Sequence, residues 1–253
     1  MTPENAPGAG RRSRLSRDRV LRSAIGLADN EGIEGLTMRR LGDVLGVEAM
    51  SLYNHIANKE DLLHGMIDAL FAEIELPPHN EHWKAALRKR SVSVREVLRS
   101  HPWANGLMDS GTNPGPATLR HHNSVLGAFR NGGFSHTMAA HAFSALDSYI
   151  YGFAKQEKTL RFDTGEQAAA KAQILLAQLP AAEYPYLHEL MAMHVLQPVY
   201  SYADELGFGV NLVLDALEQA RDAEDGDRIR TGQPSDLLSG PVEKGGIQAP
   251  AGE

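Results

Sequence analysis

Residues 36–56 read LTMRRLGDVLGVEAMSLYNHI. Thr37 suits an N-cap position, because its hydroxyl can accept a hydrogen bond from a free backbone N–H of the first helical turn. The apolar residues after it recur at helical spacing and predict one buried face; they are Met38, Leu41, Val44 and Leu45. Arg39, Arg40 and Asp43 fall on the outer face. Gly46 then ends the helix, since glycine adopts a left-handed conformation at no steric cost.

A second short helix is predicted for residues 49–56. Leu52 and Ile56 lie four residues apart and form its buried side. Its exposed side combines small, polar and aromatic groups, which are Ala49, Met50, Ser51, Tyr53, Asn54 and His55. The major groove of DNA admits one helix, and a second helix behind it sets the angle of entry. The pair therefore indicates a helix-turn-helix that reads DNA.

The same spacing also fits a short helix pair in an ordinary bundle, because such pairs occur without DNA. The flanking sequence favours DNA binding. A first helix is predicted from Arg17 to Asn30 after a Ser16 cap, and a fourth from the Asn58 cap to Ile74, with Lys59 placed for a phosphate contact. Prolines 77 and 78 cannot continue that helix and mark a domain boundary.

Residues 16–74 resemble the DNA-binding domain of the TetR family, in the runs 33–37, 39–41, 45–47, 51–55 and 58–63. The resemblance implies a three-helix head followed by a connecting helix. It also implies a set of DNA-contacting residues, namely Thr37, Arg39, Arg40, Glu48, Ala49, Met50, Ser51, Tyr53, Asn54, His55 and Lys59.

The composition indicates a globular chain. Its 253 residues, of which 42% are hydrophobic, suffice for one large or two modest domains. The absence of cysteine excludes disulfides and cysteine metal sites and fits a reducing compartment, so the cytoplasm is the expected location. No apolar run approaches the roughly 18 residues of a membrane span, and the N-terminus lacks the apolar core of a signal peptide.

Charge is distributed unevenly along the chain. The net charge is −7, yet residues 11–22 hold six arginines against one aspartate, whereas residues 222–253 hold seven acids against three basic residues. Phosphates respond to local basic patches, so the overall acidity does not exclude DNA. We expect residues 1–15 to be a disordered basic arm, either simply solvated or touching DNA, and residues 224–253 to be a disordered acidic tail.

The remaining chain predicts an all-α second domain over residues 79–223, after a head at residues 16–76. Helical segments are predicted at residues 81–100, 104–109, 116–131, 136–156, 166–178, 186–193 and 207–223, with no competing strand pattern.

Apolar residues in the helices at 136–156 and 207–223 fit either an interior core or a subunit interface. Residues 147–153 and 208–212 resemble the dimer-forming helices of the tetracycline-repressor-like subgroup of the TetR family. The resemblance implies a homodimer that binds a palindromic operator through double-stranded DNA contacts. Its expected interface residues are Ile150, Phe153, Val210, Val213, Leu214 and Leu217.

A further group of apolar, aromatic and polar residues either fills the core or lines a pocket for a small-molecule effector. As a set they occupy segments that wall the effector pocket in the resembling family. The expected pocket residues are His101, Trp103, Asn105, Leu107, Met108, Phe129, Phe143, Leu146 and Tyr149. The connecting helix from Lys59 to Ile74 would then link this pocket to the head.

Metal and enzyme chemistry are not expected. The adjacent His121 and His122 do not share a helix face, and neither do His136 and His141 at a spacing of five. His79 and His82 lack a nearby third ligand, so we expect no metal and no cofactor. The sequence contains no nucleophile elbow, phosphate-binding loop, dinucleotide fingerprint or zinc-protease helix. It also lacks a match to the drug-chelating histidines of the tetracycline repressor, which argues against tetracycline as the effector.

The sequence thus predicts an all-α, homodimeric transcription regulator, a repressor that a small molecule releases from its operator. The alternative is a helical small-molecule-binding or interaction protein without sequence-specific DNA binding. Met50 and Asn54 differ from residues frequent in the resembling family and leave the base preference open.

Overall fold

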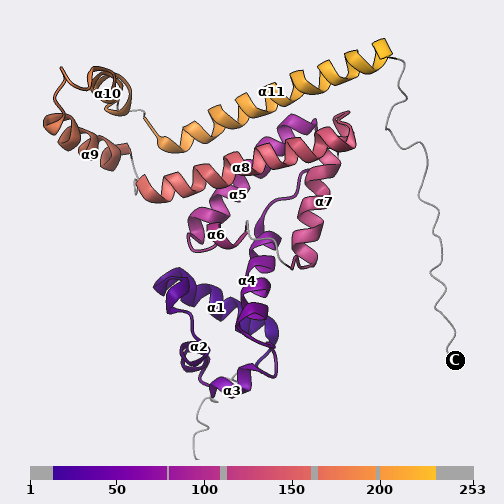
Figure 1. Ribbon diagram of the computed structural model, residues 1–253. Helices are drawn as coiled ribbons and strands as arrows, with labels where there is room; N and C mark the ends of the chain where they lie inside the picture. Colours follow the sequence, from indigo (N-terminus) through magenta and orange to yellow (C-terminus); the bar gives the residue numbers. More distant parts are fainter. Residues whose placement is uncertain (1–13, 79, 109–112, 161–164, 198–199, 232–253) are drawn as a thin grey trace, which may run out of the picture.

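The computed structural model describes residues 14–78, 80–108, 113–160, 165–197 and 200–231, and over these residues its regular elements are all helices (Figure 1). The all-α prediction is thereby confirmed for the described part of the chain. Most of the predicted N-terminal arm, and residues 232–253 of the predicted tail, lie outside it. The helices are α1 (Arg17–Glu31), η1 (Ile33–Gly35), α2 (Met38–Leu45), α3 (Ala49–Leu52), α4 (Lys59–Glu73), α5 (Trp83–Ser100), α6 (Asn105–Met108), α7 (Pro116–Asn131), α8 (His136–Leu160), α9 (Gly165–Gln178), α10 (Pro185–Leu190), η2 (Met191–Val195) and α11 (Tyr202–Thr231).

Local capping determines where the head helices begin. The side chains of Ser16, Thr37 and Asn58 each accept a hydrogen bond from the backbone N–H three residues later, at 3.3, 3.1 and 2.8 Å. Each cap satisfies a donor that would otherwise lack an intrahelical partner. The predicted starts of α1, α2 and α4 are therefore confirmed.

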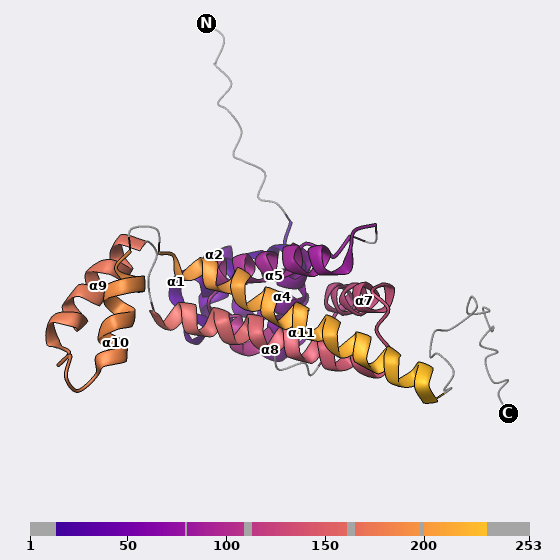
Figure 2. The same ribbon diagram turned by 90° about the horizontal axis from the view of Figure 1, so that it is seen from above.

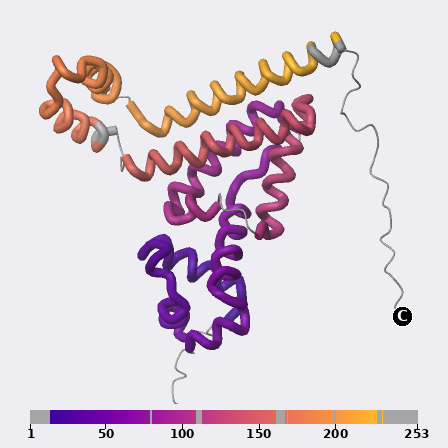
Figure 3. Tube along the Cα trace, viewed as in Figure 1, coloured from indigo at the N-terminus to yellow at the C-terminus, as the bar shows by residue number. Residues whose placement is uncertain are grey.

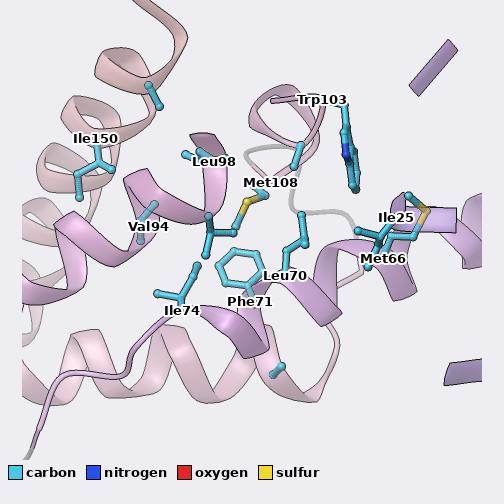
Figure 4. Packing of buried hydrophobic residues seen from close by; sticks show 14 of the residues in the cluster. Ile25, Met66, Leu70, Phe71, Ile74, Val94, Leu98, Trp103, Met108 and Ile150 are labelled. Carbon is cyan, nitrogen blue, oxygen red and sulfur yellow. The ribbon is translucent and has the colours of Figure 1, made fainter. Parts of the chain in front are cut away.

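Helix α4 contributes buried residues to both the head and the second domain. Its buried residues Leu62, Met66, Leu70 and Phe71 are part of one continuous apolar cluster that also includes residues of α1 and of α5 to α8. Figure 4 shows Met66 on the side of Ile25 and Trp103, and Phe71 near Leu98 and Met108 of the second domain. Burying a large aliphatic or aromatic side chain stabilises the fold by roughly 1.5–3 kcal/mol. The head is consequently packed onto the second domain rather than tethered to it.

The second domain is a layered helical bundle. Helices α8 and α11 lie side by side over α5 and α7, as both views show (Figures 1 and 2). Helices α9 and α10, with η2, pack mainly on one another and form a lobe that projects beyond α8 (Figure 3).

Several predicted boundaries are wrong. Helix α3 ends at Leu52 rather than at residue 56, and the chain continues in turns closed by bonds from the N–H groups of His55 and Ile56 to the Leu52 carbonyl. Val44, predicted to be buried, is 52% exposed. The helix predicted at 207–223 begins at Tyr202 and continues to Thr231, so residues 224–231 are helical and not a disordered tail.

Packing explains the longer last helix. Asp204 and Glu205 lie in its first turn, where negative charge is favourable, and Gly209 lies where a Cβ would collide with the Tyr149 ring on α8. Near its other end, the Ser135 hydroxyl donates to the Glu224 carboxylate at 2.9 Å. These tertiary contacts override the weak helical signal of the glycines and charged residues.

A buried polar cluster joins three helices of the second domain. The Arg90 side chain on α5 is almost completely buried and binds the Asp147 carboxylate on α8 at 2.5 Å. It also donates through Nε to Nε2 of His121 on α7 at 3.1 Å. Burial, aided by the Arg90 charge, lowers the pKa of His121 to about 3. His121 is therefore neutral at physiological pH and accepts from Arg90 instead of repelling it.

We predict that Asp147→Ala destabilises the protein by about 3–5 kcal/mol, because it leaves Arg90 as an unpaired buried charge. Urea unfolding at pH 7, followed by circular dichroism, measures the change. Asp18→Ala is the matched control, since Asp18 forms an exposed ion pair with Arg22 and such pairs contribute little. Equal effects of the two substitutions would contradict the importance of the buried cluster.

Candidate nucleic-acid interface and effector cavity

Close contact of α2 and α3 positions the candidate DNA-reading surface. Gly46 adopts the left-handed conformation, with φ of 68°, and its N–H bonds back to the end of α2. Gly42 lies against the next segment so closely that a Cβ would be 2.8 Å from the Val47 carbonyl oxygen. The two glycines thus permit a sharp turn and a tight helix crossing, which holds α3 at a defined angle on α2.

The outer side of this pair carries most of the predicted DNA-contacting residues. Met50 is 74% exposed and Tyr53 44% exposed. The other members of the set are exposed or partly exposed, and they are Thr37, Arg39, Arg40, Glu48, Ala49, Ser51, Asn54, His55 and Lys59. Leu52 and Ile56 are fully buried, as the sequence predicted. The surface is therefore accessible to a duplex along its whole length.

Three basic residues of this set differ in whether they form an ion pair within the chain. Arg40 is held by Glu31 at the end of α1, with its Nη2 2.7 Å from a carboxylate oxygen. Within the described part of the chain, Arg39 and Lys59 have no ion-pair partner. Arg39 and Lys59 are accordingly free of the kind of ion pair by which Arg40 joins α1 and α2.

An ion pair that the sequence analysis did not predict fixes the turn that follows α3. Arg17 on α1 binds the Asp61 carboxylate on α4 at 2.6 Å and donates to the His55 carbonyl at 3.1 Å. The hydrogen bond from Arg17 lowers the pKa of Asp61 to about 2. The pair therefore stays charged well into the acidic range and ties α1 and α4 to the turn that follows α3.

A cavity of about 330 Å³ lies between α4, α6 and α7. Its lining consists of Glu60, Leu63, His64, Ile67, Phe71, Leu107, Met108, Asn113, Pro114, Gly115, Thr118 and His122. Burial lowers the pKa of His122, so this ring enters the cavity wall in its neutral form. The combination of apolar surface and a few hydrogen-bonding groups is typical of small-molecule sites.

The connecting helix α4 forms one wall of the cavity. Leu63, His64, Ile67 and Phe71 all belong to α4, which also carries Lys59 at the edge of the reading surface. Nearby, Oδ1 of Asp68 on α4 accepts from the backbone N–H and the hydroxyl of Thr118 on α7, at 2.8 and 2.9 Å. A molecule in the cavity therefore contacts both helices that this clamp joins.

The structure brings only Leu107 and Met108 of the nine predicted pocket residues to this cavity. Phe129 packs against Trp83 and Phe134 elsewhere in the domain, and Leu146 is fully buried in the core. Phe143 does not line the cavity but packs against His122, which does, with the two ring centroids 5.2 Å apart. Helical spacing identified these residues as buried, but it could not show which cavity their helix faces.

The other four predicted pocket residues have partners of their own. His101 and Trp103 both bind Asp29 on α1, and the Asn105 side chain donates to the Tyr151 carbonyl on α8. The Tyr149 hydroxyl donates to the Glu205 carbonyl on α11, and this ring lines a second cavity of about 600 Å³ beside the projecting lobe. These four residues join elements of the fold, Tyr149 also lines the second cavity, and their role in binding an effector stays a prediction.

The predicted dimer residues face the interior of the chain. Ile150, Phe153, Val210 and Leu214 are buried where α8 and α11 pack together, and Val213 and Leu217 are partly buried against the same core. The opposite side of α11 instead presents Phe208, 65% exposed, and Leu212, 56% exposed. An amphipathic pattern locates the apolar faces of a helix but does not tell which face the same chain covers.

Among the residues that the structure describes, no group of three histidine, aspartate or glutamate side chains is arranged to hold a metal ion. None of the described helices is long and apolar enough to cross a membrane.

Comparison with known proteins gives a consistent assignment. The family described as "Tetracyclin repressor-like, C-terminal domain" matches residues 76–221. An HTH-type transcriptional regulator of Saccharopolyspora erythraea is 33% identical over 197 residues, which are 74% of this chain and 83% of the relative. The HTH-type transcriptional repressor DrrR1 of Streptomyces coeruleorubidus is 30% identical over 84% of this chain and 80% of its own length. These curated relatives are regulators of transcription, not enzymes.

A solved structure supports the same assignment for the fold. The TetR family protein ActR of Streptomyces coelicolor, in complex with actinorhodin, has a TM-score of 0.67 and 24% identity, and the match covers 83% of this chain and 99% of ActR. The helical head, the connecting helix and the helical second domain thus agree with the family match and the curated relatives, and the chain belongs to the TetR family of ligand-responsive, DNA-binding transcriptional regulators.

Proposed function

We propose that the chain is a repressor that binds its operator through the outer faces of α2 and α3. We further propose that it is released from the operator when a small molecule binds in the cavity beside α4. The observation that carries this proposal is the position of α4, which walls the cavity and carries Lys59 beside the reading surface. We also propose that the protein acts in the cytoplasm and has no enzymatic activity of its own.

The contacts to DNA divide by chemistry. Lys59 and Arg39 supply charge for phosphates, whereas Tyr53, Met50 and Asn54 are exposed on or just after α3, where base edges or sugars are within reach. Arg17 does not belong to this contact set, because its guanidinium is engaged with Asp61.

We predict that Lys59→Ala weakens binding to DNA and reduces the salt dependence of binding by about one unit of slope, as expected for one lost phosphate contact. Tyr53→Ala should weaken binding without unfolding the head. Fluorescence anisotropy at several salt concentrations measures both, with a duplex that the wild-type protein selects from a random pool. Lys89→Ala is the control, since Lys89 lies on α5 and pairs with Glu81. Unchanged affinity in both head variants would exclude this face.

We infer that the dimer forms through the outward faces of α8 and α11. On α11 this face carries Phe208 and Leu212, and on α8 it carries the small residues Ser144, Ser148 and Gly152, which allow close helix approach. The projecting lobe adds exposed apolar groups such as Tyr186 and Met193, so the partner surface extends onto it. A two-fold dimer matches a palindromic operator with half-sites about 34–36 Å apart.

We predict that Leu212→Glu converts the dimer to a monomer, because it places a charge in an interface that must exclude water. Light scattering measures the mass, and circular dichroism verifies the fold. Leu119→Glu is the matched control, as Leu119 is a comparably exposed leucine on α7. A Leu212→Glu protein that remained dimeric would place the interface elsewhere.

The effector should be a small, largely apolar molecule with hydrogen-bonding groups at its edge. Leu63, Ile67, Leu107 and Met108 supply the apolar walls, and Thr118, His122 and His64 supply polar groups. Release of DNA requires that the ligand prefer a conformation in which the two reading surfaces are wrongly spaced. A tenfold loss of operator affinity needs about 1.4 kcal/mol of such preference.

We predict that a compound binding this cavity quenches or shifts tryptophan fluorescence and lowers operator affinity. Actinorhodin, which the related ActR binds, is one starting compound in a screen of apolar small molecules. Leu63→Ala should weaken the binding of any hit by removing apolar contact from the wall. Leu119→Ala, outside the cavity, should not. A hit that binds with wild-type affinity to the Leu63→Ala protein does not occupy this cavity.

A further inference from the structure

A separate cavity of about 240 Å³ lies where the start of α5, the end of α7 and α11 come together. Figure 1 shows that this end of α7 points away from the head. The lining includes Pro77 and Pro78, which follow α4, and Ala128 of α7. No described residue lines both this cavity and the effector cavity beside α4. The two cavities are therefore distinct places in the second domain.

The Trp83 ring forms a fixed wall of this cavity. Trp83 is only 4% exposed, and its ring packs edge-on against Phe134 with 4.9 Å between the ring centroids. Gly132 lies so close that a Cβ there would be 2.7 Å from Cγ of Trp83. The Gly132 carbonyl in turn accepts from Nη1 of Arg221 on α11 at 2.7 Å. The wall is consequently held by both α7 and α11, and it is not a chance depression of a mobile surface.

Two polar groups of the lining have no hydrogen-bond partner among the described residues. Ser124 is 8% exposed and its hydroxyl makes no such bond, whereas the buried Ser91 on α5 donates to the Leu87 carbonyl at 2.7 Å, as helix serines often do. The indole N–H of Trp83 also lacks an acceptor. Buried hydroxyl and indole groups normally have partners. Both groups therefore indicate a ligand that accepts hydrogen bonds.

The charges around the cavity favour a neutral ligand. Glu81 and Arg221 bring opposite charges to the lining, and each is already paired, Glu81 with Lys89 at 2.8 Å and Arg221 with Asp222 at 2.7 Å. The guanidinium carbon of Arg221 also lies 5.8 Å from the centroid of the Trp83 ring, so a cationic ligand would meet like charge at this ring. Neither lining charge thus offers an unpaired counter-charge to an ionic ligand.

We propose that this cavity is a second small-molecule site, which takes a neutral carbonyl compound with one small ring. A cavity of about 150 Å³ can hold benzene, so the volume here accommodates a ring with a substituent. The carbonyl oxygen has two lone pairs and accepts from the Ser124 hydroxyl and the Trp83 N–H, while the ring lies against Pro78 and Ala128. Nε1 of Trp83 is enclosed by its neighbours, so its bond forms with a side-chain adjustment of the kind that commonly accompanies binding. The inference does not depend on the proposed function of the effector cavity.

Nuclear magnetic resonance of the full-length protein, with isotope-labelled indole nitrogens, tests the site directly. The chain has two tryptophans, so the spectrum contains one indole signal from Trp83 and one from Trp103, and Trp83→Phe assigns them. The probes are benzamide and cyclohexanone, and toluene is the hydrocarbon matched to benzamide. We expect benzamide and cyclohexanone to move the Trp83 signal in a saturable way and to leave the Trp103 signal in place, because Nε1 of Trp103 is bound to Asp29.

Variants of α7 separate recognition of the carbonyl from simple filling of space. Ser124→Ala should weaken benzamide binding about fivefold, since one hydrogen bond is lost, and should leave toluene binding unchanged. Asn123→Ala is the matched control, because Asn123 is exposed beside Ser124 and does not line the cavity. Ala128→Leu should abolish the saturable shift by filling the cavity. If circular dichroism shows that Ala128→Leu does not fold, Ala128→Val takes its place. Leu63→Ala, which alters only the effector cavity, should bind benzamide as the wild type does.

Four results would overturn the inference. No saturable shift with either carbonyl probe shows that the cavity does not bind this class of compound. A shift of the Trp103 signal alone places the probe in another part of the protein. Equal affinity for toluene and benzamide, or unchanged benzamide affinity in the Ser124→Ala protein, shows that the cavity does not recognise a carbonyl group.

Discussion

The buried side of α4 packs against α1 and α7, and its Phe71 lies near Leu98 of α5 and Met108 of α6, within one continuous apolar cluster (Figure 4). Because Met66 and Phe71 belong to the same rigid helix, the head cannot rotate freely about a linker. A change in the packing around Phe71 would therefore change the position of the head. In the proposed function, this short, buried connecting helix turns a change inside the second domain into a change in the spacing of two DNA-reading surfaces.

Charged groups complement this apolar packing by specifying orientation. Arg90 and Asp147 join α5 to α8 in the interior, and Arg17 and Asp61 join α1 to α4 at the surface of the head. A buried ion pair gains little net stability over well-packed apolar residues, but a misplaced partner leaves a charge uncompensated at a cost of several kcal/mol. Such pairs therefore discriminate against alternative packings of helices whose apolar faces could slide past each other.

Much of the fold could be predicted from the sequence, because the decisive signals are local. The caps at Ser16, Thr37 and Asn58 and the turn at Gly46 are each read within one helical turn. The family resemblance of the head was carried by contiguous residues in the same region. Signals of this kind do not depend on the rest of the chain.

The candidate sites were harder to predict, because their partners lie far apart in sequence. Asp29 meets His101 and Trp103 more than 70 residues later in the chain, and no periodic pattern connects them. Val210 and Leu214 were correctly recognised as apolar, yet α8 of the same chain covers them, which leaves Phe208 and Leu212 outside. Arg90 did leave a signal, since it interrupts the apolar stripe of Leu87 and Val94 on α5 and so required a buried partner.

The energies of the contacts between the two domains suit a regulator. The apolar contacts of α4 contribute several kcal/mol in total, which is enough to keep the head folded and attached. The two hydrogen bonds to Asp29, whose side chain is 27% exposed, contribute about 1 kcal/mol each in a partly solvated setting. Their sum, about 2 kcal/mol, is of the same order as the preference of roughly 1.4 kcal/mol that changes operator affinity tenfold. Breaking this polar contact therefore costs much less than breaking the apolar contact of α4, which would unfold the junction.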